Sequence, residues 1–196
     1  MIEIQDTKEQ KFDKQELEIT IANHCAPVLC GIKSSNMICV NRHEANSICK
    51  VCRETNLSTT CLFENCQKSV LLLYNRLMME QTMNEFKNKE FLENQGYETL
   101  EVIDVLHEVS KRFTSYKQNE AEFPHELGIL LGYPVWDVIG FIENKGENCL
   151  YTGYWKVYYE LSKAIVTFHQ YDNARKKVLN KIKQGNTLAS ILAGGM

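Results

Sequence analysis

The chain has 196 residues and a mass of 22.7 kDa, with a formal net charge of -3 at pH 7, 44% hydrophobic residues and 24% charged residues. These proportions are ordinary for a globular protein, and the two signs of charge are interspersed, so neither a nucleic-acid nor a membrane-surface partner is indicated. No apolar run approaches the roughly 18 residues of a membrane helix, and the N-terminal segment lacks the apolar core of a signal peptide. We expect a cytoplasmic protein with a single domain over residues 1–196.

The chain holds eight cysteines. A disulfide scaffold is not expected, because the chain is long enough to build a core and carries no export signal. We therefore expect thiols. Some would be buried as small apolar residues, and others would be reactive or bind a metal.

The first half of the chain predicts a helix followed by a small sheet. The helix is expected over residues 8–23, and Pro27 is expected to begin a second short helix, PVLCGI. Cys25 would then precede a helix N-terminus, where the dipole favours a thiolate. Strands are expected at SSNMICVN, CLFEN and QKSVLLLYN, with a short helix over residues 43–53 between the first two. The unbroken run Val70–Leu73 indicates a strand buried on both faces.

The second half predicts helices almost throughout. A helical segment is expected over residues 76–94, and an amphipathic helix over residues 100–113. Two prolines at helix starts and two glycines at helix ends then predict a tight helix-turn-helix pair over residues 124–146. A last long helix is expected over residues 156–184. The pattern is that of an α+β fold, with a small three-stranded sheet in the N-terminal half and a helix-rich C-terminal half.

The helix-turn-helix pair lacks the side chains that read DNA. Its second helix carries Val, Trp, Ile, Gly and Phe where a recognition helix carries Arg, Asn or Gln. The tyrosine-rich segment that follows, YTGYWKVYY, could cover a pocket, stack on a flat ligand or pack into the core. Residue type alone favours core packing.

Several fragments resemble the marks of one protein family. They are HCAPVLCGIKSSN, the strand around Leu71–Tyr74 followed by Arg76, FPHELGILLGYP, DVIGFIENKG and YTGYWKVY. The family is a domain of unknown function from anaerobic, spore-forming bacteria, so the resemblance implies membership but no activity. The chain departs mildly from the pattern at Cys30, where such proteins tend to have a small residue. Five further cysteines lie outside the marks: Cys39, Cys49, Cys52, Cys61 and Cys66.

The first candidate site is a thiol centre on Cys25. A nucleophilic thiol needs a lowered pKa, a neighbouring base and a third group that orients the base. His24 is adjacent, and His125 and Glu126 come from the expected helix start far along the chain. The expected catalytic residues are therefore Cys25, His125 and Glu126. In the alternative, Cys25 is a small buried residue and His125 a capping or core-bonded imidazole.

We expect a small-molecule pocket around this thiol, between the HCAP turn and the FPHE and GYP helix starts. Three classes stay open: a thiol-dependent enzyme, a non-catalytic binder of a metal, haem or other cofactor, and a protein-interaction or regulatory module. No P-loop, GxGxxG, HExxH or GxSxG occurs, so standard nucleotide sites and the common hydrolase and metalloprotease classes lose support. The sequence specifies neither a cofactor nor an oligomeric state. The expected ligand-binding residues are His24, Lys33, Asn36, Tyr133, Tyr154 and Trp155.

The second candidate site is a metal centre. Four cysteines within 18 residues, spaced C-x2-C and C-x4-C, could hold zinc or an iron–sulfur cluster. Against this, no Gly/Pro-rich knuckle frames either pair. A mixed set of His24, Cys25 and His125 is another arrangement that could hold a metal or haem iron. The four-thiolate set comprises Cys49, Cys52, Cys61 and Cys66.

Overall fold

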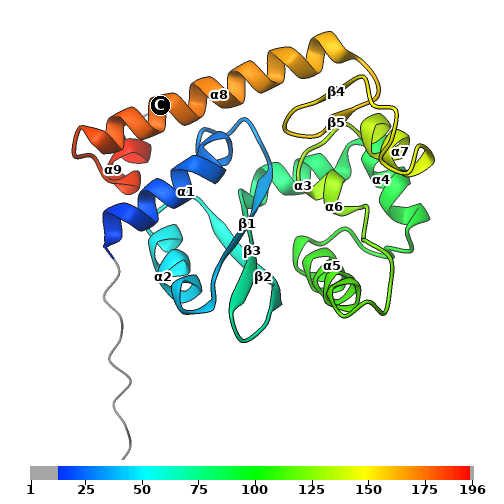
Figure 1. The fold of residues 1–196 in the computed structure, drawn as a ribbon, viewed down its shortest axis with the longest axis horizontal. Coiled ribbons are helices and arrows are strands. Elements are labelled where there is room, and N and C mark those ends of the chain that lie inside the picture. The colour runs from blue at the N-terminus through cyan, green and yellow to red at the C-terminus, as the bar shows by residue number, and fades with distance from the viewer. Residues whose placement is uncertain (1–12, 195–196) are drawn as a thin grey trace, which may run out of the picture.

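A computed structural model describes residues 13–194 as an α+β fold, with a three-stranded antiparallel sheet in the N-terminal half and mostly helices after it (Figure 1). The expected fold class is confirmed. The start of the helix predicted over residues 8–23 lies outside the described residues. In chain order the elements are α1 (Lys14–Leu29), β1 (Ser35–Asn41), α2 (Arg42–Arg53), β2 (Ser58–Glu64), β3 (Lys68–Tyr74), α3 (Arg76–Asn84), α4 (Phe86–Asn94), α5 (Val102–Lys117), α6 (Leu127–Leu130), α7 (Val135–Glu143), β4 (Tyr151–Thr152), β5 (Lys156–Val157), α8 (Leu161–Lys183) and α9 (Leu188–Ala193).

The strand order is β1-β3-β2, so the most apolar strand lies in the centre and pairs on both edges. On β3, Leu71 lies opposite Ile38 of β1 and Cys61 of β2. The expected burial of Val70–Leu73 on both faces is confirmed, since all four side chains are buried. An unbroken apolar run is what a strand with both faces covered requires.

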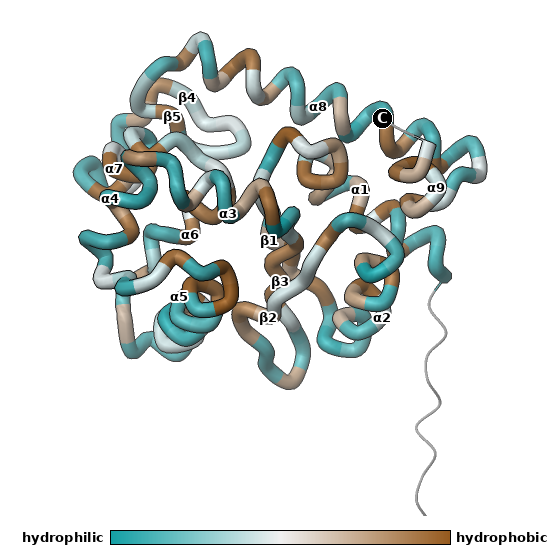
Figure 2. Tube along the Cα trace, turned by 180° about the vertical axis from the view of Figure 1, so that it is seen from behind, coloured by the Kyte–Doolittle hydropathy of each residue, from teal (hydrophilic) through white to brown (hydrophobic). Residues whose placement is uncertain are grey.

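The sheet separates two hydrophobic cores. Leu71 and Leu73 pack with α1 and α2 on one face, whereas Val70 and Leu72 pack with α5 and the helices around α6 on the other. Figure 1 shows α2 and α5 on opposite sides of the strands. Figure 2 shows the hydrophobic segments gathered on the strands between these helices.

The prediction that a new helix begins at Pro27 is wrong. α1 runs through Pro27 to Leu29, so Cys25 lies in the last turns of a helix and not before its N-terminus. Proline disfavours a helix interior, but α1 lies along α8 and buries Ile21, Cys25 and Val28 in the first core. The packing of this helix face outweighs the cost of a proline in the helix interior, because most of the stability of a protein helix comes from tertiary packing.

The prediction of one helix over residues 156–184 is wrong at its start. Residues 151–157 form the small hairpin β4–β5, and α8 begins only at Leu161. The backbone at Gly153 in the hairpin turn lies so close to the Phe168 ring of α8 that a Cβ there would be 2.2 Å from Cε2. Phe168 therefore packs against this turn, and the segment folds back instead of extending the helix.

The expected helix pair over residues 124–146 is present as α6 and α7. α6 has only four residues and begins after Pro124, whereas α7 follows Pro134 as predicted. Within residues 13–194, no helix combines the length and the apolar character that crossing a membrane requires.

Candidate functional site

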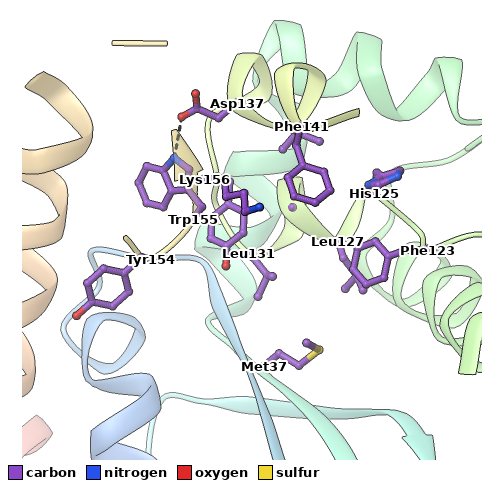
Figure 3. Close-up of a pocket in the computed structure, with 13 residues that line it drawn as sticks. Met37, Phe123, His125, Leu127, Leu131, Asp137, Phe141, Tyr154, Trp155 and Lys156 are labelled. Carbon is purple, nitrogen blue, oxygen red and sulfur yellow. Dashed lines mark hydrogen bonds between the residues drawn. The ribbon is translucent and has the colours of Figure 1, made fainter. Parts of the chain in front are cut away.

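An apolar cavity of about 310 Å³ lies between α6, α7 and the β4–β5 hairpin, with one residue of β1 at its edge (Figure 3). Most of its lining is hydrophobic or aromatic, and a few polar side chains join it. Clefts with this mixture are the usual sites of small-molecule binding. The lining residues are Met37, Phe123, His125, Leu127, Gly128, Leu131, Tyr133, Asp137, Val138, Phe141, Tyr154, Trp155 and Lys156.

Asp137 fixes the hairpin to α7. Its Oδ2 accepts a hydrogen bond from the indole Nε1 of Trp155 at 2.7 Å, and its Oδ1 accepts the backbone N–H groups of Tyr158 and Tyr159 at 2.8 and 2.9 Å. The carboxylate is only 3% exposed. Three donors satisfy this buried charge, so Asp137 holds the wall of the cavity in place.

The aromatic wall is built around Trp155. Its ring stacks on Tyr133 with centroids 5.3 Å apart and meets Phe168 of α8 edge-on at 4.5 Å. Tyr154 donates its hydroxyl proton to Asp172 of α8 at 2.9 Å. Tyr133, Tyr154 and Trp155, three of the expected ligand-binding residues, therefore all line this one cavity.

The two basic groups of the cavity lie beside the Phe141 ring. The His125 ring is 5.7 Å from Phe141 and 5.6 Å from Phe123, and the Lys156 ammonium is 5.9 Å from Phe141. Lys156 also donates to the carbonyl of Gly146 at 2.6 Å. Burial lowers the pKa of His125, which makes its imidazole neutral at pH 7, with one donor and one acceptor. Figure 3 shows His125 and Phe123 across the cavity from Trp155.

Glu126 points away from the cavity into a separate buried network. Its Oε1 accepts hydrogen bonds from the Tyr97 hydroxyl at 3.1 Å and from Arg112 at 2.9 Å. Arg112 also lies over the Tyr97 ring and pairs with Glu108. Glu126 therefore ties the α6 turn to α5, where its carboxylate is hydrogen-bonded, and it acts on His125 through its charge, which opposes the lowering of the imidazole pKa.

Cys25 lies in the first core, among residues of α1 and α2, and does not line the cavity that contains His125. Its side chain is fully buried, and burial raises the pKa of the thiol, with Cys52 adding to the rise and Lys33 opposing it. The neighbouring His24 is exposed. Of the expected thiol centre, Cys25 therefore lies in the first core and His125 in the lining of the cavity.

The N-terminal mark and the GYP segment lie against each other. Ser34 and Ser35 both donate hydroxyl protons to the carbonyl of Leu130 at the end of α6, at 2.9 and 2.7 Å. Gly132 then turns the chain with a φ of +71°, and a Cβ there would lie 2.9 Å from the Ser34 hydroxyl. A second cavity, of about 470 Å³, lies between the two segments, with Lys33 in its lining.

The four cysteines of the expected metal site are not brought together. Cys49 and Cys52 lie on α2, Cys61 on β2 and Cys66 in the turn before β3. Within the described residues, no three His, Cys, Asp or Glu side chains form a group that could hold a metal ion, which also removes the mixed set of His24, Cys25 and His125. All eight cysteines fall in the described part, and none forms a disulfide.

Sequence reasoning missed several residues of the first cavity. Met37, Leu131 and Phe141 read as ordinary core positions, and nothing in their spacing links β1 to α7. Asp137 and Lys156 carried a usable signal, since a carboxylate in an apolar helix and a lysine between Trp155 and Val157 both need polar partners.

Comparison with known proteins gives one match. A family model described as "Protein of unknown function (DUF3793)" matches residues 21–192, which include Cys25 and the whole lining of the cavity. Searches of curated proteins and of solved structures found no match.

Proposed function

The chain belongs to the family of proteins of unknown function DUF3793, and from that starting point we propose that it binds a small, mostly apolar molecule with an acidic group in the 310 Å³ cavity. The observation that carries the proposal is the cavity itself. Its lining is aromatic and aliphatic, with one lysine and one neutral histidine beside the Phe141 ring, and its one carboxylate, Asp137, already accepts three hydrogen bonds from the protein. Aromatic walls offer flat contact area, and the few polar groups fix orientation.

Lys156 supports the choice of an acidic group. Its ammonium donates one hydrogen bond to the carbonyl of Gly146, which leaves two further N–H donors for a carboxylate. His125, with its pKa lowered by burial, adds a neutral donor without a second positive charge. Lys156 as a whole is exposed, so the pair would be partly screened by water, while the apolar lining beside it strengthens the pair relative to bulk solvent.

The size of the cavity supports a ligand of one or two rings. Ligand sites commonly span roughly 300 to 1,000 Å³, and about 310 Å³ lies at the lower end. Dinucleotides and other large cofactors exceed that space. We also propose that the protein works in the cytoplasm as one domain, with a small-molecule partner and neither nucleic acid nor membrane; eight cysteines without a disulfide fit a reducing compartment.

A thiol-dependent enzyme is supported less well than a binding protein. The thiol of Cys25 is buried in the other core with a raised pKa, so it lacks the thiolate character that nucleophilic attack needs. Glu126 is taken up by Arg112 and Tyr97. No ionisable pair in the cavity is arranged as nucleophile and base.

The test is a titration with two matched probes, 2-naphthoate and the uncharged 2-naphthalenemethanol. Trp136 does not line this cavity, so a Trp136→Phe protein leaves Trp155 as its only tryptophan and fluorescence reports on the site directly. We expect saturable binding of naphthoate with a Kd of roughly 10 to 500 μM, as its small size allows.

Two variants test whether the probes bind in this cavity and whether Lys156 recognises the carboxylate. Lys156→Met removes the ammonium but keeps the apolar stem, and it should weaken naphthoate about tenfold while leaving the alcohol unchanged. Met37→Phe places a bulkier ring in the cavity lining without adding a second tryptophan, and it should weaken both probes about tenfold. Lys176→Met, at an exposed position of α8, is the matched control. Binding that neither cavity variant weakens, or a failure of both probes to bind at 2 mM, would contradict the proposal.

A further inference from the structure

Lys33 is a buried lysine to which the described part of the chain gives no carboxylate partner. Its side chain belongs to the loop between α1 and β1 and is only 4% exposed. Among residues 13–194, no Asp or Glu forms a salt bridge with it. Lysines are almost never buried unless they are paired with an opposite charge, so this position calls for a chemical reason.

The groups around the Lys33 amine hold it in place without neutralising it. The Nζ donates a hydrogen bond to Oδ1 of Asn36 at 2.5 Å, and Nδ2 of Asn36 donates to the carbonyl of His24 at 2.7 Å, which fixes the orientation of the amide. The Nζ also lies 5.4 Å from the ring centroid of Tyr133 and 5.8 Å from that of Tyr171. The amide oxygen and the two ring faces favour the ammonium over the amine, but none of them supplies the full negative charge that a carboxylate would.

Lys33 and both rings line the 470 Å³ cavity between the GIKSS and GYP segments. Trp136 adds a third aromatic side chain, and Asn88 adds an amide. The cavity is separate from the ligand site proposed above, although Tyr133 borders both. We propose that Lys33 forms an imine with an aromatic aldehyde that occupies this second cavity.

The proposed reaction is a reversible condensation that needs no further reagent. The lone pair of the neutral Nζ attacks the carbonyl carbon and gives a carbinolamine. Two protons move from the nitrogen to the former carbonyl oxygen, which leaves as water while the carbon–nitrogen double bond forms. Desolvated lysines on an apolar wall are the ones that proteins use for this chemistry.

Burial is what favours the neutral amine of Lys33 over the ammonium. Burial lowers the pKa of Lys33 to about 8, and the nearby Cys25 opposes this shift. An amine of pKa about 8 is unprotonated in roughly one molecule in ten at pH 7, compared with roughly one in 3,000 at a pKa of 10.5. The other titratable groups that face this space are Tyr133, Tyr171, Glu85 and Lys87.

Reductive trapping tests the proposal on the full-length protein. We would incubate it at pH 7 with 2-hydroxybenzaldehyde and sodium cyanoborohydride, which reduces the imine to a stable secondary amine, and map the modified lysines by peptide mass spectrometry. Lys33 should be modified at least tenfold faster than the exposed lysines. In urea that advantage should disappear, because it depends on the fold.

Two variants separate the proposal from general accessibility. Asn36→Asp keeps the shape but places a carboxylate at the amine, which should hold it as an ammonium and slow labelling of Lys33 at least tenfold. Lys87→Met removes the other lysine of the same cavity and should leave labelling of Lys33 unchanged. Labelling of exposed lysines while Lys33 reacts only after unfolding would overturn the proposal, and so would an Asn36→Asp protein that labels as fast as the wild type.

Discussion

Asp137, Glu126 and Lys33 are each almost fully buried, yet they are held in different ways. Asp137 accepts three hydrogen bonds, and Glu126 accepts one from a guanidinium and one from a phenol. For both carboxylates, hydrogen-bond donors of the protein replace the lost water. Each carboxylate also connects one element of the fold to another. Lys33 has one amide oxygen and two ring faces, and no carboxylate among residues 13–194 pairs with it. At the residue scale, Lys33 is therefore the one of these three buried groups that has no oppositely charged or matched set of partners to replace its lost hydration.

The burial of Lys33 predicts a pH dependence of stability. The folded pKa of about 8 lies below the usual 10.5, so the unfolded chain binds more protons between these values and the free energy of unfolding gains from Lys33 as the pH rises from 8 to 10.5. The full gain corresponds to about 3 kcal/mol. We expect Lys33→Met to be more stable than the wild type below pH 8, with the difference shrinking towards pH 10.

Urea denaturation of both proteins at pH 7, 8, 9 and 10 checks this. Cys25 and Cys52 act in the opposite direction, because burial raises their pKa values and the unfolded thiols ionise first. Their effect is common to both proteins and drops out of the difference. A stability difference that does not change with pH would show that the Lys33 amine is not desolvated in the native state.

At the element scale, the sequence predicted what periodicity and turn residues encode. The apolar run of β3, the starts of α3 and α7 and the amphipathic α5 all follow from local pattern, and each is present close to its expected position. The predictions from sequence failed where contacts between distant segments determine the local structure. Pro27 is accommodated inside α1 because that helix packs against α8. The β4–β5 hairpin is held by Asp137, which accepts the Trp155 indole N–H and the backbone N–H groups of Tyr158 and Tyr159 directly after β5. The cavity depends on the same distant contacts, so its lining was only partly foreseen.

Gly153 carries a prediction for the hairpin. A Cβ at this position would lie 2.2 Å from Cε2 of Phe168, far inside van der Waals contact, so Gly153→Ala must displace that ring from Trp155. We expect a loss of about 2 kcal/mol, typical of overpacking in a core. Urea denaturation measures the loss, and near-UV circular dichroism should report the disturbed tryptophan. Thr152→Ala, at the adjacent exposed position, should change stability by less than about 0.5 kcal/mol. Equal losses in the two variants would mean that the hairpin does not pack as described.

At the scale of the whole molecule, one strand and one helix join the two halves. β3 contributes Leu71 to the first core and Leu72 to the second, in adjacent positions of one backbone. α8 contributes Val178 to the first core and carries Phe168 and Tyr171 beside the aromatic wall. Figure 1 shows α8 extending over both α1 and the hairpin.

This sharing predicts a single unfolding transition, because neither core can lose β3 without exposing the other. Near-UV circular dichroism reports on Trp155 in the C-terminal half, and pulsed alkylation of Cys25 and Cys52 reports on the first core. We expect the two urea midpoints to coincide within about 0.2 M, the usual criterion being that different probes give one transition. Cys66, which is exposed, should be alkylated at every urea concentration and serves as the internal control. Two separate midpoints would mean that the halves unfold independently.

Tyr133 stands between the two cavities, with one contact to Trp155 in the first and one to Lys33 in the second. A ligand in either space that turns this ring alters the walls of the other. Thermodynamic linkage is reciprocal. If a ligand in the first cavity changes the affinity of the second cavity by some factor, a ligand in the second cavity changes the affinity of the first by the same factor. Through this one tyrosine, the two neighbouring cavities would be coupled, so that occupation of each cavity changes the affinity of the other for its ligand.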